Sequence, residues 1–586
     1  MVVAALAACH PAKPATVRVE PANVRTVVPP AVAPAMADAI APASRMIAVQ
    51  VPPGVVELEA LAWRPWIPAE SLLELAGTIQ NLQPQGLVDV PQAARLFARV
   101  SAVDAAIVAW ANGRSILLEL DCQKPIAATD LRAVQCDGGR ADDATLTNVA
   151  ALRDLTALDL ARSDVTDAGL AQLANLAALQ WLGLSYMEVT GAGLAQLAKL
   201  PALQAIDLSY SGVTDAGLAS LPALRSLDLG STAVTDAGLA NVAKAKTLVS
   251  LSLWETKVTD AGMKHVAALP KLQALDLTET QVGDRGAAQL ARAKSLQILV
   301  LWDSQITDAG LVHVGKLTDL RELELPFTKV TDAGLVQLAT LTALESLDLK
   351  FTKVNGTGLR HLARLPALHA INLADSETTD DGLAQIAKLP ALQSLDVSHG
   401  HFTPAGLAHL AELTGLQALD LSSTEVTDAD LHALADLRAL RELHLAFSDV
   451  TGAGFVHLAK LTEMRSLDLR HTDVTDDGLA QLTGMTKLES IDLAGTKTTD
   501  AGLAYLATLT SLRSINLEST AITDAGLAHL AKLRGLRSIK LDQAKVTEAG
   551  MAKLTGLTFL QAVHVGMRDY LCTDFNKVVG RRVCKI

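Results

Sequence analysis

The sequence predicts an α/β solenoid, because one unit of fixed length recurs along most of the chain and holds both a strand-like and a helix-like pattern. The glycine of a DAGL motif marks the unit at Gly169, Gly193 and Gly217, and the series continues to Gly550. The steps are 24 residues long, apart from one step of 21 that ends at Gly238. A fixed period of this size is typical of repeat architectures. The spacing gives seventeen units, and a degenerate eighteenth precedes them.

Each unit has a short strand followed by a short helix. Leu227 and Leu229 alternate with polar residues, which predicts a strand with a leucine face turned inward. From Asp236 to Ala243 the apolar spacing is helical. The array is therefore expected to stack one strand and one helix per repeat.

The start of each helix has its own signature. Thr235 and its equivalents are suited to cap the helix, and the Asp that usually follows meets the positive end of the helix dipole. In one unit this Asp is Pro404, which is tolerated at the first helical position. The motif glycine falls at the third helical position. Because Asp430 and Thr145 occupy the same slot, close packing explains the glycine better than a positive φ does.

The unit resembles the leucine-rich repeat, LxxLxLxxN, with threonine at the asparagine position (Thr232, Thr256, Thr280, Thr328 and Thr352). The TDxGLxxLA stretch resembles the cysteine-containing subclass found in F-box proteins and in many bacterial proteins, although its cysteines are absent. The resemblance covers residues 141–567. It implies a horseshoe of 17 to 18 repeats, with a parallel sheet on the concave face and short helices on the convex face. Both ends of such a solenoid need caps.

The remaining segments differ from the repeats in composition. Residues 1–9 are interpreted as the remnant of a signal peptide, and the Pro- and Ala-rich residues 10–45 as an extended linker. Residues 46–140 are expected to form an N-terminal cap, and residues 568–586 a C-terminal cap. An independent enzyme domain in 46–140 is the alternative, but that segment carries no catalytic motif.

The N-terminus resembles a bacterial lipoprotein. Leu6-Ala7-Ala8-Cys9 is similar to a lipobox, whose cysteine is lipidated, and the linker that follows suits an anchored protein. The basic start of a signal peptide is missing, which suggests a start codon further upstream. A chance match in an Ala-rich stretch is the alternative. The expected location is extracytoplasmic, with the chain lipid-anchored in the bacterial envelope at the outer membrane.

Four further cysteines flank the repeats: Cys122, Cys136, Cys572 and Cys584. Of the three pairings, two would join opposite ends of a long solenoid, which disulfide geometry forbids. Cys122–Cys136 and Cys572–Cys584 are therefore predicted, each within a cap. Four free thiols in a cytoplasmic protein are the alternative.

Composition and motifs exclude several classes of function. The net charge is −13 and no basic stripe is evident along the chain, which disfavours nucleic acid as a partner. No apolar run is long enough to span a membrane. HExxH, CxxC and GxSxG motifs are absent, and the loop-like 310–316 is followed by Leu317, where a phosphate loop has Ser or Thr. We expect no catalytic residues, cofactor or metal.

Two features point to the concave face as a binding surface. An acidic residue, Asp348 among others, lies between the strand leucines in ten repeats, and aromatic residues follow the strands in a chain with only 3% aromatics. Tyr and Trp are common interface anchors. The candidate ligand-binding residues are Trp181, Tyr186, Tyr210, Trp254, Trp302, Phe327, Asp348 and Phe351. A solvated acidic face and ring packing within the solenoid are the alternatives.

The sequence thus favours a non-enzymatic lipoprotein that binds a protein or polymer through its concave face. The alternative is a structural or adhesive envelope protein without a single dedicated ligand.

Overall fold

The computed structural model describes residues 118–120, 133–136, 141–221, 223–560, 562–565 and 584–585. The chain divides into two units, Met1–Ala48 and Val49–Ile586, and all described residues belong to the second. Cys9, the linker, most of the two predicted caps, Cys122 and Cys572 lie outside the described residues. Their predicted roles stay predictions.

The described strands form one parallel sheet of 21 strands, in which each strand pairs with its neighbours in the sequence. The strands are β1 (Leu118–Leu120), β2 (Ala133–Cys136), β3 (Ala157–Asp159), β4 (Trp181–Gly183), β5 (Ala205–Asp207), β6 (Ser226–Asp228), β7 (Ser250–Ser252), β8 (Ala274–Asp276), β9 (Ile298–Val300), β10 (Glu322–Glu324), β11 (Ser346–Asp348), β12 (Ala370–Asn372), β13 (Ser394–Asp396), β14 (Ala418–Asp420), β15 (Glu442–His444), β16 (Ser466–Asp468), β17 (Ser490–Asp492), β18 (Ser514–Asn516), β19 (Ser538–Lys540), β20 (Ala562–His564) and β21 (Cys584–Lys585). The 18 strands from β3 to β20 follow the predicted repeat, and β1, β2 and β21 extend the same sheet.

Each repeat returns through a short helical segment. The α-helices are α5 (Leu146–Val149), α6 (Asp167–Leu170), α7 (Gly191–Leu197), α8 (Asp236–Val242), α9 (Met263–Val266), α10 (Asp284–Leu290), α11 (Asp308–Val314), α12 (Asp332–Leu335), α13 (Asp380–Ile386), α14 (Pro404–Ala408), α15 (Asp476–Ala480), α16 (Asp500–Leu506), α17 (Asp524–Leu530) and α18 (Glu548–Ala552). The 3₁₀ segments are η2 (Ala171–Asn175), η3 (Gly217–Ser220), η4 (Asp260–Gly262), η5 (Val336–Thr340), η6 (Thr357–Leu362), η7 (His409–Glu412), η8 (Asp430–Leu434), η9 (Ala453–Lys460), η10 (Gln481–Gly484) and η11 (Lys553–Gly556).

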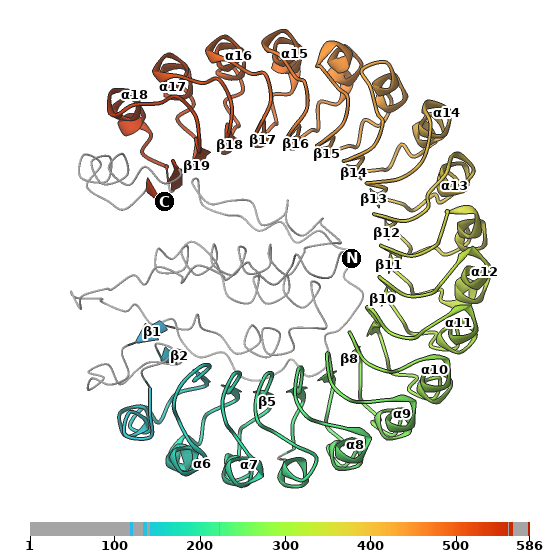
Figure 1. Ribbon diagram of the computed structural model, residues 1–586, viewed down its shortest axis with the longest axis vertical. Coiled ribbons are helices and arrows are strands. Elements are labelled where there is room, and N and C mark those ends of the chain that lie inside the picture. The colour runs from blue at the N-terminus through green and yellow to red at the C-terminus, as the bar shows by residue number, and fades with distance from the viewer. Residues whose placement is uncertain are drawn as a thin grey trace, which may run out of the picture. The chain divides into compact units, whose positions relative to one another are not determined.

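The repeats curve, with the strands along the inner side and the helices along the outer side (Figure 1). The strand leucines lie between these two layers, and Leu227, Leu251 and Leu275 have no exposed surface. One continuous leucine core therefore runs through the array, because each repeat buries its apolar face against the next. The predicted α/β solenoid is confirmed.

The helix caps also join neighbouring repeats. Thr259 accepts a hydrogen bond from the amide of Ala261, as predicted for an N-cap. The preceding repeat adds a second contact, since Asp236 Oδ1 and Oδ2 accept from the amide and the hydroxyl of Thr259 at 2.8 and 2.6 Å. The Asp at the first helical position is thus a bridge between repeats as well as a partner of the helix dipole.

The motif glycine makes room for this bridge. A Cβ atom on Gly262 would lie 2.4 Å from Oδ1 of Asp236. Gly262 is not among the described residues with positive φ. Close packing is therefore the reason for the glycine, as the sequence indicated, and the packing partner is the carboxylate of the preceding repeat.

The one short repeat loses its three residues from the helical segment. η3 has four residues where α7 and α8 have seven. The strands on either side remain in register, with Ile206 opposite Leu227. A solenoid tolerates this deletion because the strand ladder stays intact and only the outer layer becomes thinner.

Among the described residues, no helix is both long and apolar enough to cross a membrane.

Candidate binding surface

A tight turn follows each strand, and its third residue has a positive φ. In the described repeats, sixteen non-glycine residues adopt this conformation, with φ between 48° and 60°, and Gly495 is the glycine in this position. The conformation costs roughly 1–2 kcal/mol for an L-residue. Hydrogen bonds along the array hold it in place: the amide of Phe327 donates to Lys350 O, and the amide of Phe351 donates to Ala374 O. Every turn therefore presents its third side chain at the same position of the rim.

The predicted threonine position completes the turn. The hydroxyl of Thr328 donates to the carbonyl of Leu325 at 2.6 Å, and that of Thr352 donates to Leu349. Both threonines are buried. The buried hydroxyl satisfies the carbonyl of the first residue after the strand from within its own turn, so the turn is rigid.

Six of the aromatic candidates belong to two stacks that lie along these turns. In the first stack, which we call stack A, the rings of Tyr186 and Tyr210 lie parallel at 4.2 Å, and Trp254 meets Tyr210 edge-on at 5.0 Å. Trp254 reaches Tyr210 across the intervening repeat because Gly230 leaves room: a Cβ there would lie 1.8 Å from the indole nitrogen.

Stack B consists of Trp302, Phe327 and Phe351 in three consecutive repeats. The ring centroids are 6.0 Å apart for Trp302 and Phe327, and 4.2 Å apart for Phe327 and Phe351. These side chains are 44%, 44% and 37% exposed. Because the ring faces cover one another, the stack offers a firm apolar strip of ring edges to a partner.

Charged side chains of both signs surround the two stacks: the guanidinium group of Arg162 lies 4.7 Å from the ring centre of Tyr186 in stack A, and Asp303, next to Trp302 in stack B, is exposed. Glu188, Glu255 and Glu279 are exposed on the turns around stack A. Burial, the neighbouring Tyr186, Glu255 and Glu279 raise the pKa of Tyr210 to about 12. Around stack B, Lys329 and Lys353 are exposed, and the ammonium group of Lys350 lies 5.1 Å from the ring centre of Phe351.

The ten strand carboxylates are buried or half-buried, and Asp228, Asp276, Asp348 and Asp468 are the buried ones. Asp348 Oδ1 accepts from the amide of Lys350 at 2.8 Å, Oδ2 accepts from Asn372 Nδ2 at 3.3 Å, and the residue is 8% exposed. Burial raises the pKa of Asp348 to about 7. In the next strand, the side-chain oxygen of Asn372 likewise accepts a hydrogen bond from the amide of Ala374. This position therefore caps the strand end, and the row of carboxylates is less exposed than the sequence suggested.

One strand carboxylate is held ionised. Asp468 contacts Arg470 at 2.7 Å and His444 at 3.6 Å. Burial alone would raise the pKa of Asp468, but hydrogen bonds from His444 and Arg470 outweigh it and lower the pKa to about 2. In the described part of the chain, no group of three or more His, Cys, Asp or Glu side chains could hold a metal ion.

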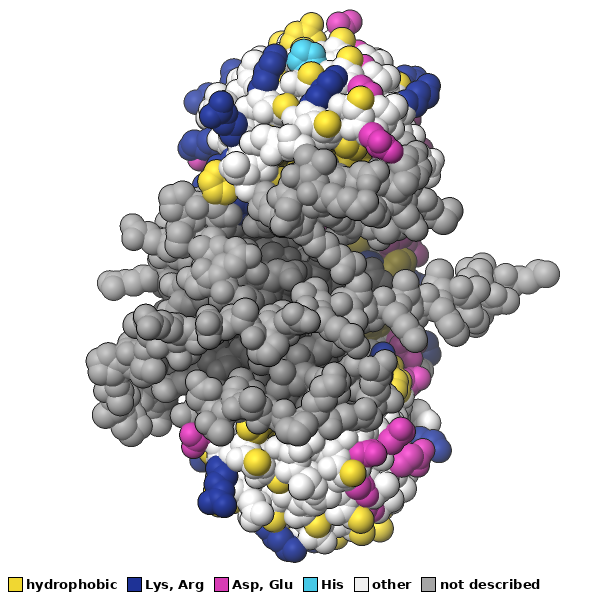
Figure 2. Space-filling model, turned by 90° about the vertical axis from the view of Figure 1, so that its left-hand side faces the viewer, with side chains coloured by type: hydrophobic (Ala, Val, Ile, Leu, Met, Phe, Trp, Pro, Cys, Tyr) yellow, Lys and Arg dark blue, Asp and Glu magenta, His cyan; other side chains and the backbone are white. Residues whose placement is uncertain are grey.

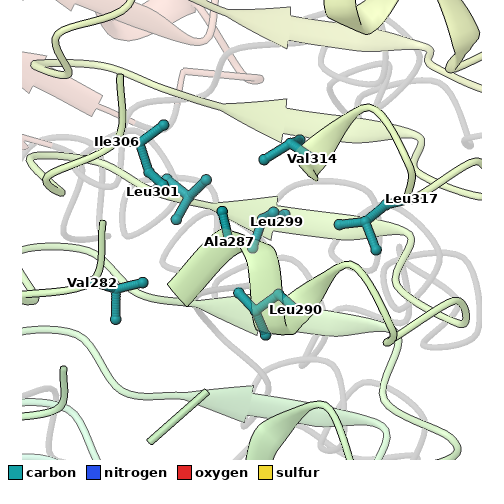
Figure 3. A pocket seen from close by; sticks show the side chains of 8 residues that line it. All are labelled: Val282, Ala287, Leu290, Leu299, Leu301, Ile306, Val314 and Leu317. Atoms are coloured by element: carbon teal, nitrogen blue, oxygen red, sulfur yellow. The ribbon is translucent and has the colours of Figure 1, made fainter. Parts of the chain in front are cut away.

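Figure 3 shows an apolar pocket between neighbouring repeats. Its lining residues are Val282, Ala287, Leu290, Leu299, Leu301, Ile306, Val314 and Leu317. Ala287 takes the helix position that is Leu239 or Leu311 elsewhere, so the smaller side chain leaves the space. The space is too small for a water molecule. It is a packing gap in the core and offers no groove for a ligand.

The eight candidate residues differ in how exposed their side chains are. Tyr186, Tyr210, Trp302, Phe327 and Phe351 are exposed, and Trp254 is half-buried. Trp181 and Asp348 are buried. Their roles in binding stay predictions. Cys136 is buried and disulfide-bonded, but Cys122 lies outside the described residues, so the pairing stays a prediction.

Two features of the surface were not predicted from the sequence. The lysines beside stack B are separated by 24 residues, so only the repeat register brings Lys329 and Lys353 together. No basic stripe was expected from the sequence, whereas exposed Lys and Arg gather along one edge of the array. Aligning the repeats by their strands would have revealed both features, because equivalent positions stack in space.

The parallel sheet and outer helices define a solenoid scaffold built from one repeat per strand. A family model described as "Leucine-rich repeat region" matches residues 140–384 and 216–456, and one described as "Leucine Rich repeat" matches 460–482 and 508–531. The chain belongs to the leucine-rich-repeat family, since the first model covers more than half of it.

Solved structures that are similar to this chain have low sequence identity to it. The TLR13–ssRNA13 complex is 20% identical with a TM-score of 0.52, covering 74% of this chain and 63% of that one. A leucine-rich-repeat protein of Leptospira interrogans is 19% identical with a TM-score of 0.43, covering 70% and 95%. An internalin of Listeria monocytogenes is 19% identical with a TM-score of 0.32, covering 67% and 82%. No curated protein sequence matches significantly.

Proposed function

We propose that this chain is a non-enzymatic binding scaffold that recognises a protein or polymer partner through the rim of its concave face. The observation that carries the proposal is stack B. Three large rings in consecutive repeats are exposed in a chain that is only 3% aromatic. Such rings cost solubility, and aromatic residues are enriched at the centres of interfaces.

The rigidity of the rim supports this role. The rings sit on turns fixed by bonds within and between repeats, such as Thr328 to Leu325 O and the amide of Phe327 to Lys350 O. A partner would not have to order these side chains, so little conformational entropy would be lost on binding. The lysines beside Phe327 and Phe351 favour a partner with acidic side chains near that part of stack B.

We further propose that the protein is a lipoprotein of the bacterial envelope, anchored through Cys9 and held extracytoplasmic at the outer membrane. The lipobox-like sequence before Cys9 and the linker after it support this placement. Loss of fatty-acid labelling in Cys9→Ser is the expected result. Equal labelling of both proteins would contradict the anchor.

The binding proposal is tested by affinity capture with the full chain on beads. The test variant combines Trp302→Ala, Phe327→Ala and Phe351→Ala. The matched control combines Val312→Ala, Val336→Ala and Tyr505→Ala, which are similarly exposed on the helical side. One partner that is retained by the wild type and the control, and lost by the test variant, is expected. Equal retention by all three proteins would contradict the proposal, and many weak partners would favour an adhesive protein.

A further inference from the structure

One edge of the solenoid is strongly basic although the whole chain has a net charge of −13. The six residues that precede each strand, from β4 to β20, contain 15 exposed Lys and Arg but only three exposed Asp or Glu within the described residues. Lys199, Lys246, Lys294, Lys388, Lys460 and Lys532 mark its course through the array. We call this row the basic edge.

The opposite edge lacks this bias. The seven residues that follow each strand, from β3 to β19, contain nine exposed Asp or Glu and seven exposed Lys or Arg. The excess of cations is therefore a property of one edge and does not reflect the surface in general.

The parallel topology puts the basic edge on one side of the array. Every residue of this row comes just before a strand, and all strands run in the same direction. In the upper part of Figure 2, dark blue Lys and Arg side chains are most frequent on the left-hand side, although others lie on the right. The cations thus form a long row along the edge and are not collected in a groove.

These cations are available to a partner. Lys244 Nζ bonds to Asn241 Oδ1 and Lys246 Nζ bonds to Ala268 O, which are neutral acceptors. Lys487 pairs with Glu463, and Arg438 lies 3.9 Å from Asp436. Most of the positive charge of the row is therefore not cancelled by the ion pairs found among the described residues.

We propose that the basic edge docks on an anionic lipid surface, with the plane of the repeats lying along the membrane. A membrane offers phosphate charge over an area, so many points of a curved row can engage at once, each adding to the attraction. A nucleic acid rod would meet only part of such a row. A second copy would have to supply anions from the opposite edge, which is almost evenly mixed. Phe559, 47% exposed before β20, could enter the headgroup layer.

The experiment is vesicle co-sedimentation of the full chain carrying Cys9→Ser, so that no acyl chain contributes. Vesicles of phosphatidylcholine with about 30 mol % phosphatidylglycerol are compared with pure phosphatidylcholine, at about 0.1 M and 0.5 M salt. We expect the partition coefficient for the anionic vesicles to be at least about tenfold higher at low salt and to fall at high salt.

Two charge-matched variants show whether the edge is responsible. The edge variant is Lys244→Glu/Lys246→Glu/Lys294→Glu. The control is Lys257→Glu/Lys497→Glu/Lys545→Glu, with the same change in net charge at exposed positions of the opposite edge. Circular dichroism checks that both remain folded. The edge variant should lose at least about tenfold in partitioning, whereas the control should stay within about twofold of the wild type.

Three results would overturn the proposal. The first is that the wild type shows no preference for anionic vesicles. The second is that both variants lose vesicle partitioning equally, which would indicate a net-charge effect. The third is salt-sensitive self-association or duplex DNA binding that the edge variant loses while vesicle binding is absent. Each result leaves the binding role of stack B untouched, because no residue of that stack is changed.

Discussion

Asp430 binds Thr427 at the helix start of its own repeat, a task that belongs to an Asp of the preceding repeat in most of the array. Asp430 Oδ2 accepts from the amide and the hydroxyl of Thr427 at 2.9 and 2.7 Å. The preceding repeat has Pro404 where most repeats have Asp, so it supplies no carboxylate. Asp430 occupies the slot of the motif glycine. Asp430 thus supplies Thr427 with the carboxylate that Pro404 cannot provide.

This exchange predicts opposite effects in single and double variants. Asp430→Gly should lower the free energy of unfolding by about 1–2 kcal/mol, since Thr427 loses its partner. Pro404→Asp alone should also destabilise, because two carboxylates would compete for one slot. The double variant rebuilds the common pattern and should recover most of the loss in urea unfolding. Additive losses in the double variant would contradict the compensation.

The motif glycines should resist a substitution that normally helps a helix. Gly310→Ala places a Cβ about 2.5 Å from Asp284 Oδ1 and should destabilise, although alanine is favoured over glycine by about 1 kcal/mol in helices. Gly484→Ala is the control, because nothing lies within 4 Å of the added atom. Thermal unfolding should show a lower Tm for the first variant and an equal or higher Tm for the second. Equal changes in Tm for the two variants would show that contact with the carboxylate does not explain the motif glycine.

The strand carboxylates make stability depend on pH with a sign that differs between positions. Burial raises the pKa of Asp348 to about 7, against about 3.9 when unfolded. The folded state therefore holds the proton more tightly. The cost of ionisation is fully present above pH 7 and disappears as the pH falls toward 4.

Asp348→Asn should consequently stabilise the protein at pH 8, by about 2–4 kcal/mol, and change little near pH 4. Asn372 shows that an amide can make the same turn bond. Asp468→Asn is the opposite control: with a folded pKa lowered to about 2, its ionised form is stabilising above pH 4, so the variant should lose stability at pH 8. Urea titrations at both pH values measure the differences. Destabilisation by Asp348→Asn at pH 8 would contradict the assigned burial.

The repeat pattern was readable from the sequence because it depends on local chemistry. The leucine alternation, the cap at Thr235 and the Pro404 exception each act within a few residues, so one repeat suffices to interpret them. The role of Asp236 was only half visible, since its second partner, Thr259, belongs to the next repeat.

The candidate site was less predictable because its properties arise between repeats. The sequence identified stack B by its aromatic residues, but the exposure of Phe327 and the burial of Asp348 depend on the conformation of the turns. A positive φ at phenylalanine has no signal in the sequence, where a glycine would be expected. The basic edge was hidden by the acidic total, since net charge says nothing about its distribution.

The most direct test of the binding role is a site-specific photocrosslinking scan in cells. A photoreactive phenylalanine analogue replaces Phe327 in one strain and Tyr505 in another; both residues are exposed, at 44% and 40%, but Tyr505 lies on the outer helix α16. We predict one discrete crosslinked product from position 327 and none from position 505, because the rim contacts the partner and the helical side does not. Products from position 505 alone, or from neither position, would contradict a binding surface at the rim.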